Sequence, residues 1–357
     1  MELEIQKVDS ANKKEIPNDD TSLGFGQVFS DHMFTMEYER GKGWHRPRIE
    51  PYRQLQLDPA AMVLHYGQEV FEGLKAYRGK DAGLYLFRYE DNLRRFNRSC
   101  DRMVIPPIDI PFVSNAMKEL VRLEKDWIPK SPGCALYLRP TVIAVDPFLG
   151  VKPAERYLFY IICGPVGAYY PEGFNPISIF ISDQYVRAVR GGIGEAKTGG
   201  NYAASLLAQM EAKEKGFSQV LWLDAIERKY VEEVGTMNIF FKFGDEVVTS
   251  PLTGSILPGI TRDSVIQLLK KWGVKVVERL FTIDDVLKAQ TEGSLSEVFG
   301  SGTAAIISPV GSIRYKDKDF QIGDGKTGQL SQKIYDHLLA LQYGYEEDTF
   351  GWIEKIG

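Results

Sequence analysis

Apolar side chains recur along much of the chain at the spacing of an amphipathic helix. Leu93, Phe96 and Cys100 lie three or four residues apart, which predicts a helix over 91–103. Similar patterns predict a short helix that begins at Thr282 and longer helices over 114–127, 201–215, 261–272 and 330–342. These segments are separated by stretches with a different pattern.

Runs rich in β-branched and aromatic residues predict strands between the helices. In the first half of the chain these runs cover 83–89, 135–145 and 156–163. In the second half they cover 177–182, 219–224, 229–234, 238–243, 246–250, 275–281 and 296–310. Gly244 and Asp245 stand between two alternating runs and indicate a hairpin. Because the order is neither a strict strand–helix alternation nor all strand, we predict an α+β protein with largely antiparallel or mixed sheets.

A dense group of glycines and prolines marks a candidate boundary between two domains. It lies at 164–176, between two apolar runs. We predict a small N-terminal α/β domain over 1–166, in which 1–20 form a loose polar tail. An interdomain loop over 167–176 and a larger C-terminal domain over 177–357 follow.

Composition narrows the class of protein without indicating its chemistry. The chain has 357 residues, of which 44% are hydrophobic and 25% charged, and its net charge is -5. This balance excludes wholesale disorder, and it lacks the basic footprint of a protein that binds nucleic acid or a membrane surface. Three cysteines without a CxxC pair argue against a zinc site. No run is long enough to span a membrane and the first residues do not form a secretory signal, so we predict a cytoplasmic protein.

Two glycine-rich segments resemble nucleotide-binding motifs only in part. The segment 191–198 is close to a phosphate-binding P-loop, but Ala196 stands where a glycine is required. The segment 300–305 matches a degenerate dinucleotide fingerprint, but Pro309 prevents a long helix from following it. The more modest interpretation of 300–305 is a turn whose backbone N–H groups can approach a phosphate or a carboxylate.

Taken together, seven motifs resemble those of the branched-chain amino-acid aminotransferases, which are pyridoxal-phosphate enzymes of fold type IV. They are HYGQEVFEGLKAY (65–77), FRYEDNLRRFNRSC (87–100), LYLRP (136–140), EAKTGGNYAASLLAQ (195–209), YVEEVGTMNIFF (230–241), LPGITRDSV (257–265) and GSGTAAIISPV (300–310). The resemblance extends from about Gly24 to the C-terminus. It implies a two-domain fold with a small α/β domain and a larger pseudo-barrel domain.

The resemblance assigns the cofactor, pyridoxal 5′-phosphate, to a defined set of residues. Lys197 would hold it as a Schiff base and move the proton at the substrate α-carbon, and Glu233 would face the pyridine nitrogen. An adjacent carboxylate raises the proton affinity of that nitrogen, whereas Glu232 alternates to the other face of its strand. The other cofactor-binding residues implied are Arg95, Tyr202, Ile260, Thr261 and Thr303.

The resemblance also implies the substrate site. It places Tyr66, Phe71, Val151 and Tyr169 in an apolar pocket, with Tyr137 and Arg139 near its edge. Arg139 is the expected counter-charge for the distal carboxylate of glutamate. The substrate α-carboxylate would bind the amides of Thr303 and Ala304, and Thr236 is a further candidate for a residue close to the substrate.

The expected reaction moves the amino group of L-leucine, L-isoleucine or L-valine to 2-oxoglutarate. The expected assembly is a homodimer in which Tyr66 and Val151 reach the neighbouring site. D-Amino-acid aminotransferase and aminodeoxychorismate lyase, which share the fold, remain alternatives, as does a non-catalytic nucleotide- or ligand-binding protein. One departure concerns the vertebrate members, which carry a CxxC pair where this chain has Ala305 and Ser308. We therefore expect no thiol switch there.

Overall fold

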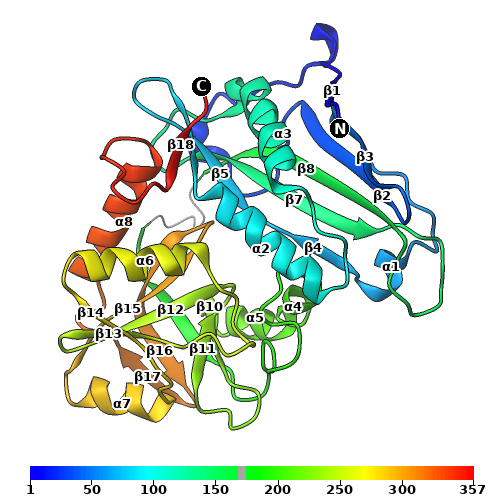
Figure 1. Cartoon of the computed structure of the whole chain (residues 1–357). Coiled ribbons are helices and arrows are strands. Elements are labelled where there is room, and N and C mark those ends of the chain that lie inside the picture. Colours follow the sequence, from blue (N-terminus) through cyan, green and yellow to red (C-terminus); the bar gives the residue numbers. More distant parts are fainter. Residues whose placement is uncertain (168–173) are drawn as a thin grey trace. The chain divides into compact units, whose positions relative to one another are not determined.

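The computed structural model describes residues 1–167 and 174–357, which divide into two compact units (Figure 1). Among these residues, the first unit contains 1–167, 196–199 and 339–357, and the second contains 174–195 and 200–338. The first unit thus includes two segments that follow the glycine- and proline-rich stretch in the sequence. The domain bounds given above stay a prediction.

One mixed sheet of nine strands, as far as the described residues show, forms the centre of the first unit. Its order is β1-β3-β2-β8-β7-β5-β6-β18, and β4 pairs with β7. Its strands are β1 (Glu4–Ile5), β2 (His32–Glu39), β3 (Gly43–Pro51), β4 (Glu69–Phe71), β5 (Leu74–Arg78), β6 (Leu84–Phe87), β7 (Ala135–Ala144), β8 (Arg156–Val166) and β18 (Ile353–Lys355). Strand β1 joins β3 in parallel, and the other neighbours run antiparallel.

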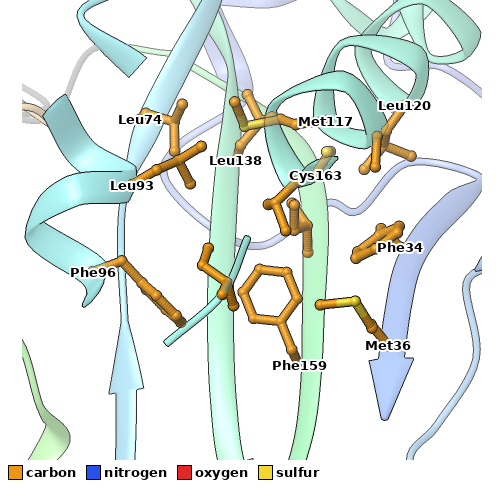
Figure 2. Packing of buried hydrophobic residues seen from close by; sticks show 14 of the residues in the cluster. Phe34, Met36, Leu74, Leu93, Phe96, Met117, Leu120, Leu138, Phe159 and Cys163 are labelled. Carbon is orange, nitrogen blue, oxygen red and sulfur yellow. The ribbon is translucent and has the colours of Figure 1, made fainter. Parts of the chain in front are cut away.

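Helices α2 (Tyr89–Arg102) and α3 (Ile110–Leu123) pack on this sheet, and α1 (Met62–Tyr66) precedes β4. Figure 2 shows the core between them, in which side chains of α2 and α3 meet those of β2, β7 and β8. The prediction of α2 is confirmed, but α3 begins four residues earlier than the periodicity indicated. The carboxylate of Asp109 accepts a hydrogen bond from the Phe112 N–H at 3.0 Å, and Pro111 is tolerated in the first turn.

The second unit also contains a nine-stranded mixed sheet within the described residues. Its order is β11-β10-β9-β16-β15-β12-β13-β14, and β17 pairs with β16. Its strands are β9 (Ile177–Ile181), β10 (Gln219–Leu223), β11 (Val231–Val234), β12 (Met237–Phe243), β13 (Glu246–Thr249), β14 (Lys275–Glu278), β15 (Leu295–Gly302), β16 (Ile306–Tyr315) and β17 (Lys318–Gln321). The predicted hairpin at Gly244 and Asp245 is confirmed as β12–β13. The two mixed sheets also confirm the α+β class.

The later helices agree with the predicted ones except in one place. They are α4 (Gly199–Ala203), α5 (Leu206–Glu214), α6 (Ile260–Lys271), α7 (Ile283–Thr291) and α8 (Gln329–Gln342). Thr282 caps α7 through a reciprocal pair of bonds with Asp285. The single helix predicted over 201–215 is wrong, because the chain turns between α4 and α5. There the Ser205 hydroxyl donates to the Tyr202 carbonyl at 2.7 Å.

None of the described helices combines the length and the apolar character that crossing a lipid bilayer requires.

Candidate active site

Lys197 lies in a short segment that packs within the first unit. Its N–H donates to the Ser99 hydroxyl at 3.0 Å, and its carbonyl accepts from the Phe71 N–H at 3.0 Å. Two residues later the Gly199 N–H donates to Glu69 Oε1. The Lys197 Nζ lies 5.1 Å from the centroid of the Phe71 ring. The backbone of this lysine is therefore held by β4 and α2, and its amine stands over an aromatic face.

Arg95 is buried on α2 and is paired with a glutamate that immediately follows β4. Its Nε and Nη2 atoms donate to Glu72 Oε1 and Oε2 at 2.7 and 2.9 Å, and the Asn92 amide donates to Oε2 at 3.0 Å. Burial would raise the pKa of Glu72, but the positive charges of Arg95 and Lys197 outweigh it and hold this pKa below its usual value. Arg94, in contrast, faces outward and pairs with Glu90.

Two aromatic rings and an arginine lie together on strands β4 and β7. The Arg139 guanidinium lies 4.7 Å from the Phe71 ring centroid and 5.3 Å from that of Tyr137, and its Nη2 donates to the Tyr137 hydroxyl at 3.1 Å. Phe71 and Arg139 come from the paired strands β4 and β7. The structure thus brings Lys197, Phe71, Tyr137 and Arg139 together within one unit.

Gly73 makes room for the Tyr137 hydroxyl, which would lie 1.8 Å from a Cβ added there. We expect Gly73→Ala to lower the free energy of unfolding by about 1–3 kcal/mol, because the phenol must move and lose its bond to Arg139. Urea unfolding measures this loss. In a Tyr137→Ala background the same change should cost far less. Equal costs in the two backgrounds would show that the phenol is not what the added methyl group meets.

Two of the predicted substrate residues are exposed on the first unit. Tyr66 is 40% exposed and Val151 is 86% exposed. The Tyr66 hydroxyl donates to the Leu149 carbonyl, so it lies beside the segment that carries Val151. Large apolar side chains this exposed suit a surface that another chain covers. Tyr169 lies outside the described residues.

Glu233 is buried on β11 in the second unit and is held by two side chains. Its Oε2 lies 2.7 Å from the Nη1 atom of Arg187, and its Oε1 accepts from the Asn238 amide at 3.0 Å. Arg187 also donates to the Ser255 carbonyl at 2.8 Å. Glu232 points to the other face of the strand, where it accepts from the Ser255 hydroxyl at 2.5 Å. The ion pair with Arg187 and the hydrogen bond from Asn238 fix the orientation of the Glu233 carboxylate.

Three turns of the second unit converge on the start of β12. Thr236 lies in the turn before β12, which pairs there with β15, and Gly302 at the end of β15 would carry a Cβ 3.1 Å from Met237. Gly259, which precedes α6, would carry a Cβ 2.0 Å from Asn238 Oδ1. The residues predicted to bind anions here are Ile260 and Thr261 at the start of α6, and Thr303 and Ala304 in the β15–β16 turn. Gly259 supplies no capping side chain, so the start of α6 suits an anion.

Tyr202 lies on α4, which is tied to the Glu233 region through a loop. The amide of its neighbour Asn201 donates to the Ile193 carbonyl at 2.8 Å, and the Gly194 carbonyl accepts from Arg187 at 3.3 Å. Arg187 in turn pairs with Glu233. Within the second unit, these contacts therefore connect the helix that carries Tyr202 to Glu233.

The sequence reasoning missed five residues that hold the predicted ones in place. They are Glu69, Glu72, Ser99, Arg187 and Asn238. The glutamates could have been found as acidic residues in the largely apolar EVFEGLKAY run. Nothing in the sequence alone indicated Ser99, because its partner lies 98 residues away. The roles of the predicted site residues themselves stay predictions.

Comparison with known proteins shows the family to which the chain belongs. The Amino-transferase class IV family matches residues 69–313, well over half of the chain. The chain therefore belongs to the class IV aminotransferase family, as the motifs predicted.

Three similar proteins are all named as branched-chain amino-acid aminotransferases. The branched-chain-amino-acid aminotransferase 2 of Bacillus subtilis is 54% identical over 350 residues, which cover 98% of this chain and 96% of that protein. The structure of the branched-chain amino acid aminotransferase from Escherichia coli is 28% identical with a TM-score of 0.73, over 92% of this chain and 99% of that one. A T.th. branched-chain amino acid aminotransferase, solved with pyridoxamine 5′-phosphate, is 29% identical with a TM-score of 0.75, over 90% of this chain and 98% of that one.

Proposed function

We propose that this chain is a branched-chain amino-acid aminotransferase that uses pyridoxal 5′-phosphate. Its substrates are L-leucine, L-isoleucine or L-valine as amino donor and 2-oxoglutarate as acceptor. The observation that carries the proposal is Lys197, whose backbone is anchored on both sides and whose amine stands over Phe71. It occurs in a chain 54% identical to a Bacillus subtilis enzyme of that name.

The donor groups of the chain match the chemistry of the cofactor. When bound, pyridoxal phosphate supplies an aldehyde and a ring that withdraws electrons from the substrate α-carbon. Lys197 Nζ is the amine that would hold the aldehyde carbon, and the Glu233 carboxylate would hold a proton on the pyridine nitrogen. The phosphate would bind Arg95, the amides at the start of α6 and the Thr303 hydroxyl. Tyr202 would donate to the phenolic oxygen.

Lys197 would also carry the proton transfer. Its Nζ would take the proton from the substrate α-carbon and return it to the cofactor side, which a fixed backbone assists because the amine can reach only a small volume. The Phe71 ring lies on one side of this amine, with its centroid 5.1 Å from Nζ. Proton transfer of this kind supplies roughly 10²- to 10⁴-fold in rate.

One pocket must accept both aliphatic side chains and the distal carboxylate of glutamate. Phe71 and Tyr137 offer apolar ring faces, and Arg139 lies over both rings with its guanidinium. This arrangement serves an aliphatic side chain through the rings and a carboxylate through the guanidinium. The amides of Thr303 and Ala304 would bind the substrate α-carboxylate, and Thr236 would lie close to the substrate.

We further propose a homodimer in which Tyr66 and Val151 complete the neighbouring site. Both side chains are exposed, as are those of Leu64, Phe148 and Leu149, which lie close to them in the sequence. Burial of such a group against a second copy would stabilise the dimer through the hydrophobic effect. Sedimentation equilibrium tests it: Val151→Asp should shift the protein toward monomer.

A survey of amino donors tests the proposed reaction. The protein loaded with cofactor should form L-glutamate from 2-oxoglutarate with L-leucine, L-isoleucine and L-valine, and far less with L-alanine or D-alanine. Transfer from D-alanine would instead favour a D-amino-acid aminotransferase. Formation of 4-aminobenzoate from aminodeoxychorismate would favour the lyase. A protein that takes up no cofactor would favour the non-catalytic alternative.

Arg139→Leu should separate the two classes of substrate. We expect kcat/KM for L-glutamate to fall about 10- to 100-fold, because a hydrogen bond to a charged group contributes roughly 1.5–3 kcal/mol. The value for L-leucine should change only severalfold. Steady-state kinetics with each donor provide the comparison. Equal losses for both donors would show that Arg139 has a structural role instead.

A further inference from the structure

The segment that carries Lys197 is anchored separately from the chain on either side of it. Residues 196–199 pack in the first unit, whereas 174–195 and 200–338 pack in the second. The anchors come from two elements that are remote in sequence, the strand β4 and the helix α2. A few hydrogen bonds from β4 and α2 therefore determine the position of the lysine backbone.

The anchors hold the lysine backbone on both sides of its Cα atom. Ser99, which is 1% exposed, accepts from the Lys197 N–H, and the Phe71 N–H donates to the Lys197 carbonyl. Beyond them, Glu69 accepts from the Gly199 N–H, and a Cβ at Gly199 would lie only 2.4 Å from Glu69 Oε1. A side chain at position 199 would therefore displace the Glu69 carboxylate from its present place.

The same two elements also hold the arginine expected at the phosphate. Arg95 lies one helical turn before Ser99 on α2, so both side chains project from the same face of the helix. Glu72, which follows β4 directly, pairs with Arg95. The helix and the strand therefore set the positions of Lys197 and Arg95 together.

We propose that Ser99 and Glu69 are positioning residues that set the Lys197 amine before the cofactor binds. This inference rests on the proposed function, because it assumes that Lys197 is the residue to which pyridoxal phosphate binds. A preorganised amine lowers the entropy lost on binding, and a lysine with a loose backbone would have to be ordered by the cofactor itself. Ser99 acts through a buried hydroxyl and Glu69 through a partly buried carboxylate.

The test compares cofactor binding in four variants with the natural protein. Ser99→Ala leaves the Lys197 N–H without its acceptor, and Glu69→Ala does the same for Gly199. We expect each to weaken the pyridoxal-phosphate dissociation constant by at least about 5-fold and to slow borohydride trapping at Lys197 at saturating cofactor. Glu69→Gln keeps an oxygen acceptor and should stay within about 3-fold of the natural protein.

A matched control separates positioning from general stability. Ser114 is another buried serine on a helix of the first unit, and its hydroxyl has no hydrogen-bond partner among the described residues. Ser114→Ala should leave cofactor affinity and trapping unchanged. The melting temperature of each variant without cofactor reports folding, and Glu69→Ala tests the proposal should Ser99→Ala fail to fold.

The outcomes are distinct. Weaker binding and slower trapping in Ser99→Ala and Glu69→Ala, with normal melting of the folded variants, support the proposal. Unchanged binding and trapping in folded Ser99→Ala and Glu69→Ala overturn it, and so does an equal loss in Ser114→Ala. If the natural protein itself takes up no cofactor at Lys197, the proposed function fails first.

Discussion

Replacing Lys197 with alanine should abolish covalent cofactor binding and lower transamination by at least about 10³-fold. The amine, which lies 5.1 Å from the centroid of the Phe71 ring, is the group that would both hold the cofactor and move the proton at the substrate α-carbon. The measurement is borohydride reduction of the loaded protein followed by peptide mapping. The natural protein should carry the reduced adduct on the peptide that contains Lys197, and the variant should carry none.

Lys213 offers the matched control for this change. It is an exposed lysine on α5, sixteen positions further along the chain. Lys213→Ala should bind the cofactor and catalyse transamination as the natural protein does. An adduct that persists in Lys197→Ala, or that lies on another peptide in the natural protein, would exclude Lys197 as the cofactor lysine.

Glu233→Gln should lower kcat by about 10²- to 10³-fold with a small change in KM. The variant removes the negative charge that would keep a proton on the pyridine nitrogen, and electrostatic groups of this kind contribute about that factor. It also disturbs the local pairing, because a glutamine has a single amide oxygen, so its N–H₂ would face either the Arg187 guanidinium or the Asn238 amide, both of which now meet a carboxylate oxygen. Steady-state kinetics with L-leucine give kcat and KM separately.

Glu232→Gln is the control for that prediction. The two glutamates are neighbours on β11 and both are buried, but Glu232 faces Ser255. Glu232→Gln should keep kcat within severalfold of the natural value. If kcat falls as much in Glu232→Gln as in Glu233→Gln, the fall results from a disturbed β11 strand and not from the loss of a carboxylate at the cofactor ring.

The elements that could be predicted from the sequence are those whose pattern is local. The helix predicted over 91–103 spans Tyr89–Arg102, and the one predicted over 330–342 spans Gln329–Gln342. The break between α4 and α5 could not be predicted, because it depends on a single serine hydroxyl that bonds the backbone of Tyr202. The early start of α3 depends on the capping by Asp109, which apolar periodicity does not register.

The candidate site shows a similar division. The resemblance assigned roles to Arg95 and Glu233, and in the structure their neighbours Arg94 and Glu232 have different partners. The partners of the site residues could not be predicted from the sequence. Arg95 meets Glu72 across 23 positions, and Lys197 meets Ser99 across 98. Contacts of such separation depend on how strands and helices pack, and no local pattern records them.

A single-turnover experiment with the loaded protein tests the central claim most directly. Excess L-leucine is added to the natural protein with no keto acid acceptor, and the products are identified by mass spectrometry. We expect one 4-methyl-2-oxopentanoate for each bound cofactor and loss of the absorbance of the bound aldehyde form. After the excess L-leucine is removed, 2-oxoglutarate should restore that absorbance and form one L-glutamate for each cofactor. Unchanged absorbance and no keto acid from L-leucine would contradict the central claim.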